Sequence, residues 1–479
     1  MFTIFIAIAI VLITTIVIWR AGWFSHHLSP SSAVLFRMDS NHTYHITASL
    51  IFDSLLPRDK LIHHVRKKLN HILPFRSVIK TTWYGWPYYD DSNKFDFESH
   101  ITSVHIDRPL SEACANQVVE QEMNKAMHPS SQLWKMKLHY FSNNKTLLLF
   151  RLNHCVADGV GSACTLLHIC EACDEPEHDQ TTTLTAKQTQ PTSSKNPILT
   201  FFEILFSTIK TICLLFVSMP EPNHTLRASD NKEQNYKVCM GSSVPLENIK
   251  NISRRLSSNQ QRVTVNDVII SALSASLRKY ILEHGKRVDK HKLSNGVNLD
   301  ISALVLADTR DHSFRNMREL MNKIKKEGLK EEFLGNNFGT LMLEMPLSFS
   351  NELQRLEWTV KETNTLKKSV MPILTKCVSF VFGFIPTPIF RFCFWTVADR
   401  TSIALSNVVG PQFRIHILGH MIEQVNFMVA PIGSMGTIIS VLSYNQQVKL
   451  CISSYQSVLP DPSLIVDYFH NTLSELESL

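Results

Sequence analysis

The order of strand-like and helix-like segments constrains the fold of this chain most strongly. Strand-like segments, apolar throughout or at alternate positions, lie at 44–52, 133–141, 146–153, 235–245, 300–310, 336–347 and 436–455. Apolar residues at helical spacing occupy 58–73, 159–173, 264–285 and 461–476. Because strands alternate with helices in both halves, we expect an α/β fold, or an α+β sandwich, in two domains.

Length and composition permit a large folded core. The chain has 479 residues, of which 44% are hydrophobic, enough for two or three domains. The net charge of +6 is small for this length and the basic residues form no stripe, so a nucleic-acid partner is not expected. Cys170 and Cys173 form a C-x-x-C pair, but no second pair and no suitably spaced histidines complete a zinc site. We therefore expect free thiols and no metal.

The first residues have the composition of a membrane anchor. From Phe2 to Trp19 the chain runs for 18 residues without a charge, close to the roughly 20 residues that cross a bilayer as a helix. A cleaved signal peptide would carry a basic start and a small-residue cleavage site, which are not evident here. We expect an anchor at 1–22, with Arg20 on its flank directing the bulk of the chain to the cytosol. The expected location is the endoplasmic reticulum membrane, with lipid droplets or the plasma membrane as alternatives.

Composition also suggests the domain boundaries. We expect one folded domain at 33–173, a linker at 174–236 and a second domain at 237–479. Within the linker, the apolar stretch 198–220 carries two charged residues, so it either crosses a membrane or lies on its surface. The aromatic-rich stretch 370–395 is interrupted by two prolines and is predicted to be either a membrane-touching hairpin or part of the core.

Polar residues follow the apolar strand that ends near Asn153. His154 comes directly after the strand, Asp158 follows four residues later, and Gly159 is next. A histidine at the end of a strand can take a proton from a hydroxyl at neutral pH, because its free pKa is about 6.5. An ordinary strand end followed by an Asp-Gly turn would have the same local pattern, so these residues alone do not decide between the two interpretations.

Several motifs in order favour the catalytic interpretation. "NHCVADG" at 153–159 resembles the H-H-x-x-x-D-G signature of the bifunctional wax ester synthase/diacylglycerol acyltransferase family, with Asn153 in place of the first histidine. "SQLWKMKL" resembles the family's Pro-Leu-Trp element, with Gln132 in place of proline. Further stretches resemble the family's Asn-Asp helix start, Gly-Asn-x-x-Gly strand and Asn-x-x-Gly-Pro element: "VNDVIISAL", "GNNFGTLMLEMP" and "SNVVGP". The resemblance covers roughly residues 35–475.

The resemblance implies a fold like chloramphenicol acetyltransferase, with two similar domains and an active-site tunnel between them. It implies transfer of an acyl group from acyl-CoA, as co-substrate, to a lipid alcohol, giving wax esters from fatty alcohols or triacylglycerol from diacylglycerol. His154 would be the general base, and the alkoxide would attack the thioester with no acyl-enzyme and no further cofactor. The second histidine of the signature carries the base role, so Asn153 leaves this chemistry possible.

Roles for other residues follow from the same resemblance. Asp158 would support the structure by pairing with an arginine, for which Arg310 is the candidate, and Gly159 would let the chain pass tightly into the next helix. Asn266 would position the reacting groups or the oxyanion, or else cap its helix.

Trp134, Asn407 and Gly410 are expected to line the substrate tunnel.

Two alternative functions stay open: an acyltransferase acting on a sterol or small alcohol, and a non-catalytic lipid-binding or tethering protein with the same fold.

Overall fold

The computed structural model describes most of the chain. The described residues are 26–39, 43–83, 85–93, 95–173, 226–228, 235–258, 261–285, 301–310, 317–330, 332–367, 369–398 and 401–479. The expected anchor at 1–22 and the apolar stretch 198–220 lie outside them. Within the described ranges, no helix combines the length and the apolar character needed to cross a membrane.

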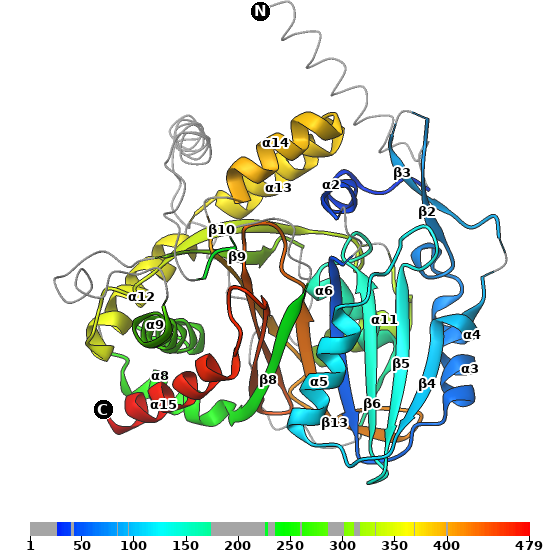
Figure 1. Cartoon of the computed structure of the whole chain (residues 1–479). Helices are drawn as coiled ribbons and strands as arrows, with labels where there is room; N and C mark the ends of the chain where they lie inside the picture. The colour runs from blue at the N-terminus through cyan, green and yellow to red at the C-terminus, as the bar shows by residue number, and fades with distance from the viewer. Residues whose placement is uncertain are drawn as a thin grey trace, which may run out of the picture.

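Two large sheets form the centre of the molecule (Figure 1). The seven-stranded sheet has the order β4 (Ile101–Ile106), β5 (Trp134–Phe141), β6 (Thr146–Asn153), β1 (His45–Phe52), β13 (His420–Val429), β12 (Ile415–Ile417) and β7 (Glu171–Ala172). The six-stranded sheet has the order β10 (Phe338–Met345), β9 (Ile301–Asp308), β11 (Ile403–Val409), β14 (Thr437–Tyr444), β15 (Gln447–Tyr455) and β8 (Tyr236–Pro245). The two sheets and their helices confirm a mixed α/β architecture.

The chain changes sheets within its second half. After β11 in the six-stranded sheet, β12 and β13 join the seven-stranded sheet, where β13 pairs antiparallel with β1. The chain then returns through β14, which pairs parallel with β11. The stretch 237–479 therefore contributes strands to both sheets, and its treatment as a separate domain stays a prediction.

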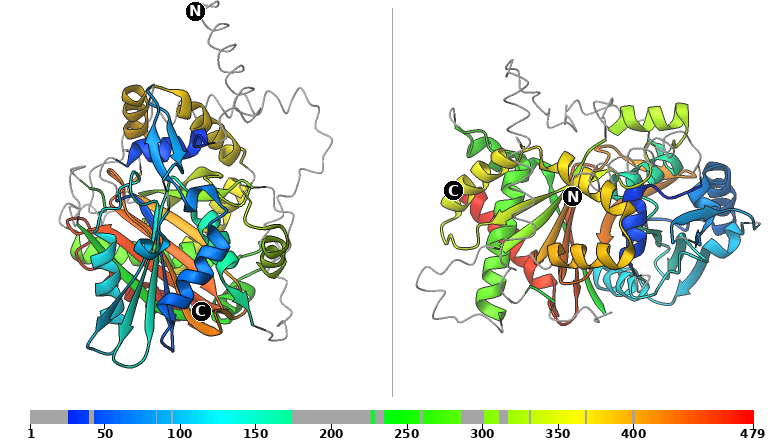
Figure 2. Two further views of the ribbon diagram at one scale, coloured as in Figure 1. Left: turned by 90° about the vertical axis from the view of Figure 1, so that its right-hand side faces the viewer. Right: turned by 90° about the horizontal axis from the view of Figure 1, so that it is seen from above.

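Helices cover both sheets (Figures 1 and 2). On the six-stranded sheet they are α8 (Leu246–Arg255), α9 (Val265–His284), α12 (Glu352–Lys367) and α15 (Ser463–Ser478), and α13 (Met371–Phe384) packs on its edge strand β10. The other helices in the described ranges are α2 (Pro30–Met38), α3 (Arg58–Leu69), α4 (Phe97–His100), α5 (Glu112–Met123), α6 (Gly159–Ile169), α11 (Met317–Glu327) and α14 (Thr387–Ala398), with a short hairpin of β2 (Val78–Thr81) and β3 (Pro87–Asp90).

Strand β6 has every residue buried, which explains why its sequence is apolar without alternation. A single hydrophobic cluster includes Leu148 of β6, Leu167 of α6 and Leu442 of β14. The core is therefore continuous from one sheet to the other, and it lies directly beside the loop that follows β6.

The helix expected at 159–173 is shorter than predicted. Helix α6 ends at Ile169, because Cys170 is extended and Glu171–Ala172 pairs with β12 as strand β7. Helical spacing of apolar residues could not show this, since the pairing partner lies more than 200 residues further along the chain. In the stretch 370–395, the break falls at Ile385 and Pro386, between α13 and α14.

Candidate active site

The loop after β6 buries His154 at the end of the strand. The backbone N–H of His154 donates to the carbonyl of Tyr44 at 3.2 Å, and only 2% of the residue is exposed. Asn153 holds the turn, since its side-chain oxygen accepts from the N–H of Cys155 at 3.0 Å and its carbonyl accepts from Val156. The chain thus leaves the sheet through a hydrogen-bonded turn that fixes the position of the histidine.

The imidazole of His154 is oriented by two neighbours. Its ring stacks on Tyr44, with centroids 4.7 Å apart and planes 4° apart. Its Nδ1 lies 3.2 Å from Oδ1 of Asn336. The amide nitrogen of Asn336 donates to the carbonyls of His154 (2.9 Å) and Cys155 (3.3 Å) and to the hydroxyl of Ser32 (3.1 Å).

These contacts determine which ring nitrogen carries the proton. Carbonyl oxygens only accept hydrogen bonds, so they fix the NH₂ end of the Asn336 amide and turn its oxygen toward His154. Nδ1 must then be the protonated nitrogen, which leaves the lone pair on Nε2. Burial lowers the pKa of His154, although the charge of Asp158 and the Asn336 hydrogen bond act in the opposite direction. The ring is therefore neutral at pH 7, as a general base must be.

The carboxylate of Asp158 accepts hydrogen bonds from three different segments of the chain. It accepts from the N–H of Gly161 at 2.8 Å, which caps helix α6. Its other oxygen accepts from the N–H of Asn337 at 2.8 Å. Arg310 donates to Asp158 at 3.0 Å, and both side chains are more than 90% buried. This ion pair confirms the predicted partner. Arg310 also bonds Asp308 at 3.0 Å, so two carboxylates compensate its buried charge.

A backbone clasp joins the loop after β6 to the loop before β10. Ala157 and Gly335 form a parallel bridge, in which Gly335 donates to Val156 and accepts from Asp158, each at 3.1 Å. Gly335 has a φ of +71°, a conformation that favours glycine. The clasp and the Asp158–Arg310 pair place Asn336 against His154, although the two lie 182 positions apart.

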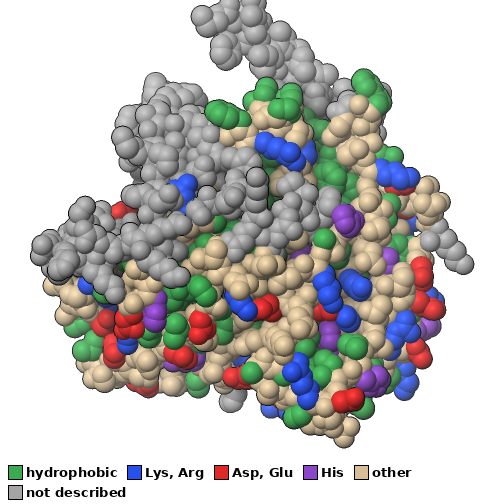
Figure 3. All heavy atoms as spheres, viewed as in Figure 1, with side chains coloured by type: hydrophobic (Ala, Val, Ile, Leu, Met, Phe, Trp, Pro, Cys, Tyr) green, Lys and Arg blue, Asp and Glu red, His purple; other side chains and the backbone are tan. Residues whose placement is uncertain are grey.

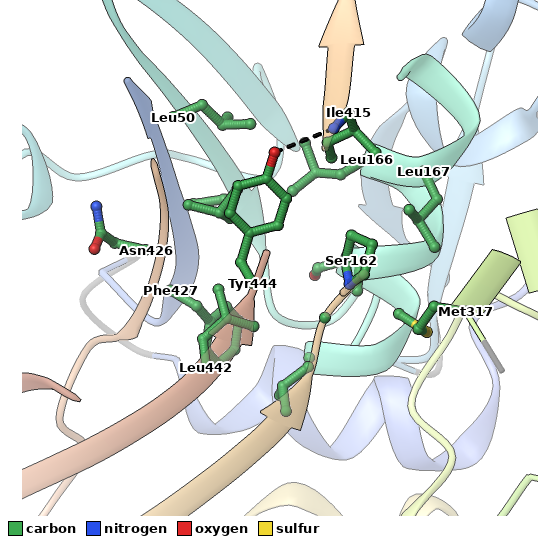
Figure 4. Close-up of a pocket in the computed structure, with 17 residues that line it drawn as sticks. Leu50, Ser162, Leu166, Leu167, Met317, Ile415, Asn426, Phe427, Leu442 and Tyr444 are labelled. Atoms are coloured by element: carbon green, nitrogen blue, oxygen red, sulfur yellow. Dashed lines mark hydrogen bonds between the residues drawn. The ribbon is translucent and has the colours of Figure 1, made fainter. Parts of the chain in front are cut away.

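An apolar cavity of about 50 Å³ lies between the sheets beside helix α6 (Figure 4). Its wall includes Leu50, Leu166, Met317, Phe427 and Leu442. Two other wall residues connect it to the predicted site: Gly159, from the start of α6, and Gly410, from the loop after β11. A Cβ on Gly159 would lie 3.2 Å from the ring of Phe427, and one on Gly410 would lie 2.5 Å from the carbonyl of Ser443. Gly410 therefore requires a residue without a side chain, whereas a side chain at position 159 would require the Phe427 ring to shift by a few tenths of an ångström.

Asn266 and Asn407 form a pair, in which Asn407 donates to Asn266 at 2.9 Å. The alternative role of Asn266 as helix cap is wrong, because Thr264 caps α9 in a capping box with Asp267. The pair connects the first turn of α9 to β11.

Trp134 lies in the hydrophobic core and does not line the apolar cavity. It is fully buried, donates from its indole nitrogen to the carbonyl of Phe75 at 3.0 Å, and packs among Phe95, Phe97 and Phe150. These are packing contacts, so the structure gives Trp134 a core position where the sequence suggested contact with substrate.

Tyr44 and Asn336 were missed by sequence reasoning. Asn336 lies within the motif "GNNFG", and its position as a polar residue directly before a strand could have indicated a site residue. Tyr44 lies at the start of a predicted strand, and its sequence neighbours do not distinguish it from an ordinary strand residue.

Comparison with known proteins gives consistent matches. Residues 28–269 match the sequence model of the wax ester synthase/diacylglycerol acyltransferase catalytic domain, and residues 334–477 match the WS/DGAT C-terminal domain. Similar relatives include wax ester synthase/diacylglycerol acyltransferase 11 of Arabidopsis thaliana, 22% identical over 87% of this chain and 86% of that protein. Wax ester synthase/diacylglycerol acyltransferase 2 of the same plant is 24% identical over 80% of this chain and 81% of its own.

Solved structures resemble the whole fold. The wax ester synthase/diacylglycerol acyltransferase from Marinobacter aquaeolei VT8 superposes with a TM-score of 0.61 at 16% identity, over 94% of this chain and 99% of that one. The first condensation domain of the calcium-dependent antibiotic synthetase also gives 0.61, at 13% identity, over 95% and 96%. At these identities the structural matches describe the fold alone.

Proposed function

The chain belongs to the wax ester synthase/diacylglycerol acyltransferase family and is an acyltransferase, and we propose that it transfers a long-chain acyl group from acyl-CoA to the hydroxyl of a lipid alcohol. The acceptor would be a fatty alcohol, giving a wax ester, or diacylglycerol, giving triacylglycerol. The observation that carries this proposal is the buried, neutral His154, whose Nδ1 proton is held by Asn336 and whose Nε2 is left with the lone pair.

In this mechanism Nε2 of His154 takes the proton from the acceptor hydroxyl. The resulting alkoxide attacks the carbonyl carbon of the thioester, and a tetrahedral intermediate forms. When the C–S bond breaks, the CoA thiolate leaves and receives the proton from His154, so the histidine ends neutral. The enzyme would contribute proton transfer and the alignment of two reactants that are dilute in water.

Direct transfer without an acyl-enzyme is supported by the cysteines near His154. Cys155 is its neighbour in sequence, but burial raises the pKa of that thiol well above its ordinary value. Burial likewise raises the pKa of Cys164 in helix α6 to about 12. A thiol in either state carries almost no thiolate at pH 7, so neither residue is suited to take up the acyl group.

The apolar cavity beside α6 supports a lipid substrate. A cavity of about 50 Å³ has room for a few water molecules. It is therefore too small for a complete fatty chain. Binding of the chain would require wall residues such as Met317 to change rotamer, which an unbranched thioether does easily. We further propose that the enzyme works at a membrane, held there by residues 1–22.

The test is an assay of membranes from cells that lack neutral-lipid synthesis and express this chain. Labelled acyl-CoA is supplied with a fatty alcohol, diacylglycerol, a sterol or a small alcohol. Ester formed by the wild type but not by His154→Ala, at equal protein levels, supports the base assignment. Equal product from both would refute that assignment. Product with a sterol or small alcohol alone would replace the proposed acceptor, and no product with any acceptor would favour a non-catalytic role.

A further inference from the structure

Exposed apolar side chains gather at one end of the molecule, on α13, α14 and the tip of the β2–β3 hairpin. Figure 3 shows hydrophobic atoms on the upper surface that these elements form in Figure 1. We define the apolar end as Trp83, Ile373, Cys377, Val381, Ile389 and Phe392. Trp83 is 96% exposed and Phe392 is 75% exposed, values far above those of ordinary apolar residues in a folded protein.

The apolar end is part of the folded structure. The hydroxyl of Thr375 accepts from the N–H of Thr340 in β10 at 2.7 Å and donates to its carbonyl at 3.1 Å, which fixes α13 on the sheet. Gly383 packs directly on Pro30 of α2. The guanidinium of Arg37 lies 5.7 Å from the ring centroids of both Trp86 and Phe390, which joins the hairpin to α14.

Helix α13 has one inward and one outward face. Thr375 and Gly383 are buried, whereas Ile373, Cys377 and Val381 are exposed at a spacing of four residues. This spacing aligns the three side chains along one side of the helix. The exposed side chains therefore form a stripe along α13, on the side opposite its packing contacts.

The charge pattern around this surface fits a lipid headgroup layer. Residues 363–398 contain no Asp or Glu, but they contain three lysines and one arginine. Arg391 is exposed directly beside Phe392 and donates to the carbonyl of Arg37 at 3.2 Å. On α13 and α14 the charged side chains are thus all cationic, which matches an interface that has acyl chains beneath anionic headgroups.

The chain enters the described structure at this same end. The carbonyl of His26 accepts from the N–H of Tyr89 at 2.7 Å, and Leu28 donates to Pro87 at 3.1 Å. The described chain therefore begins next to the β2–β3 hairpin, and residues 20–25 separate this point in the sequence from the uncharged run Phe2–Trp19.

The apolar end is also close to the predicted base. Helix α2 packs against α13, and Ser32 of α2 accepts from Asn336, which bonds His154. We propose that the apolar end rests on a phospholipid surface, with the exposed stripe of α13 and the start of α14 among the headgroups and first acyl carbons. A lipid alcohol would then reach the site from the bilayer; this benefit rests on the proposed function, whereas the docking itself does not.

The test uses the full chain bound to phosphatidylcholine vesicles, with and without phosphatidylserine. An environment-sensitive dye is attached to Cys377, with Cys213 and Cys393 replaced by serine. The control carries the dye at Leu55→Cys, with Cys377→Ser in addition. Leu55 is 45% exposed and follows the end of β1 farthest from His154. We expect lipids brominated in the acyl chain to quench the dye at position 377, more strongly with phosphatidylserine, and to leave the control dye unchanged.

Three outcomes would overturn the proposal. The dye at 377 could stay unquenched on vesicles that hold the protein. The emission of the dye at 377 could report a shielded environment before lipid is added and stay the same afterwards, which would show that residues 2–19 cover the surface. A dimer lost in Phe392→Glu would show that a second copy does so.

A second variant links docking to activity. Ile389→Glu with Phe392→Glu is expected to abolish the quenching and to slow ester formation with a bilayer-borne alcohol at least tenfold, while a short soluble alcohol reacts at the wild-type rate. Leu55→Glu is the matched control and should change neither. Quenching without any esterification would support the docking and refute the proposed function. Esterification without quenching would support the proposed function and refute the docking.

Discussion

Replacing Asn336 tests how the two halves of the protein orient His154, the proposed base. In Asn336→Ala, Nδ1 of His154 loses its acceptor at 3.2 Å, and the carbonyls of His154 and Cys155 lose their donor. We expect kcat to fall and KM to change little, because Asn336 is not among the residues that line the apolar cavity.

The size of the effect follows from the bonds that are lost. A neutral hydrogen bond contributes about 1 kcal/mol net, and leaving a buried group unpaired costs roughly 1–3 kcal/mol. The stacking of the ring on Tyr44 remains and still restrains its plane. Because each 1.4 kcal/mol corresponds to about a tenfold change in rate, kcat should fall about 10- to 100-fold, much less than on removal of the base itself.

The pH profile separates orientation from simple destabilisation. In the wild type, burial lowers the pKa of His154, so we expect the acid limb of kcat below the pH at which a free histidine titrates. Asn336→Asp places a carboxylate beside Nδ1–H, which favours the imidazolium and raises this pKa. The acid limb should therefore move to higher pH, as measured by initial rates of ester formation from pH 5 to 9. An Asp variant that is folded, active and unchanged in its pH profile would refute the assignment.

Other residues give further predictions. Asp158→Ala leaves a buried arginine short of one partner and uncaps α6, so unfolding free energy should fall by about 3–5 kcal/mol in chemical denaturation, with Asp158→Asn less affected. Gly159→Val narrows a cavity where an added Cβ already meets a ring at 3.2 Å, so turnover of long-chain acceptors should fall more than that of short ones. Cys155→Ala should keep activity; complete loss in a folded variant would argue for an acyl-enzyme. Burial lowers the pKa of His139 to about 4. The unfolded chain then binds this proton more readily, and stability should fall as pH drops from 6.5 to 4, an effect that His139→Gln should reduce.

Local sequence patterns predicted much of the secondary structure. Helix α9 was predictable because its apolar periodicity depends only on which face of the helix is buried, and strand β6 because a short apolar run bounded by turn residues is typical of a fully buried strand. The return of β13 to the first sheet was not, since a strand pattern does not specify its partner. For the same reason, the ion pair of Asp158 with Arg310 was predicted only through the family resemblance. The contact of Asn336 with His154 was not predicted, because the two residues lie 182 positions apart in the sequence.

These contacts explain how Asn153 can replace the first histidine of the H-H-x-x-x-D-G signature. Residue 153 ends β6, and its side chain bonds the N–H of Cys155, so it stabilises the turn that presents the next residue. The state of the imidazole at 154 depends instead on Asn336 and Tyr44, which come from outside that turn. A histidine at 153 would have to hold the same turn, while the tautomer of the base would still be set by Asn336. Asparagine at 153 is therefore compatible with the proposed role of His154 as base, because the residue that orients its imidazole lies on the opposite loop of the clasp.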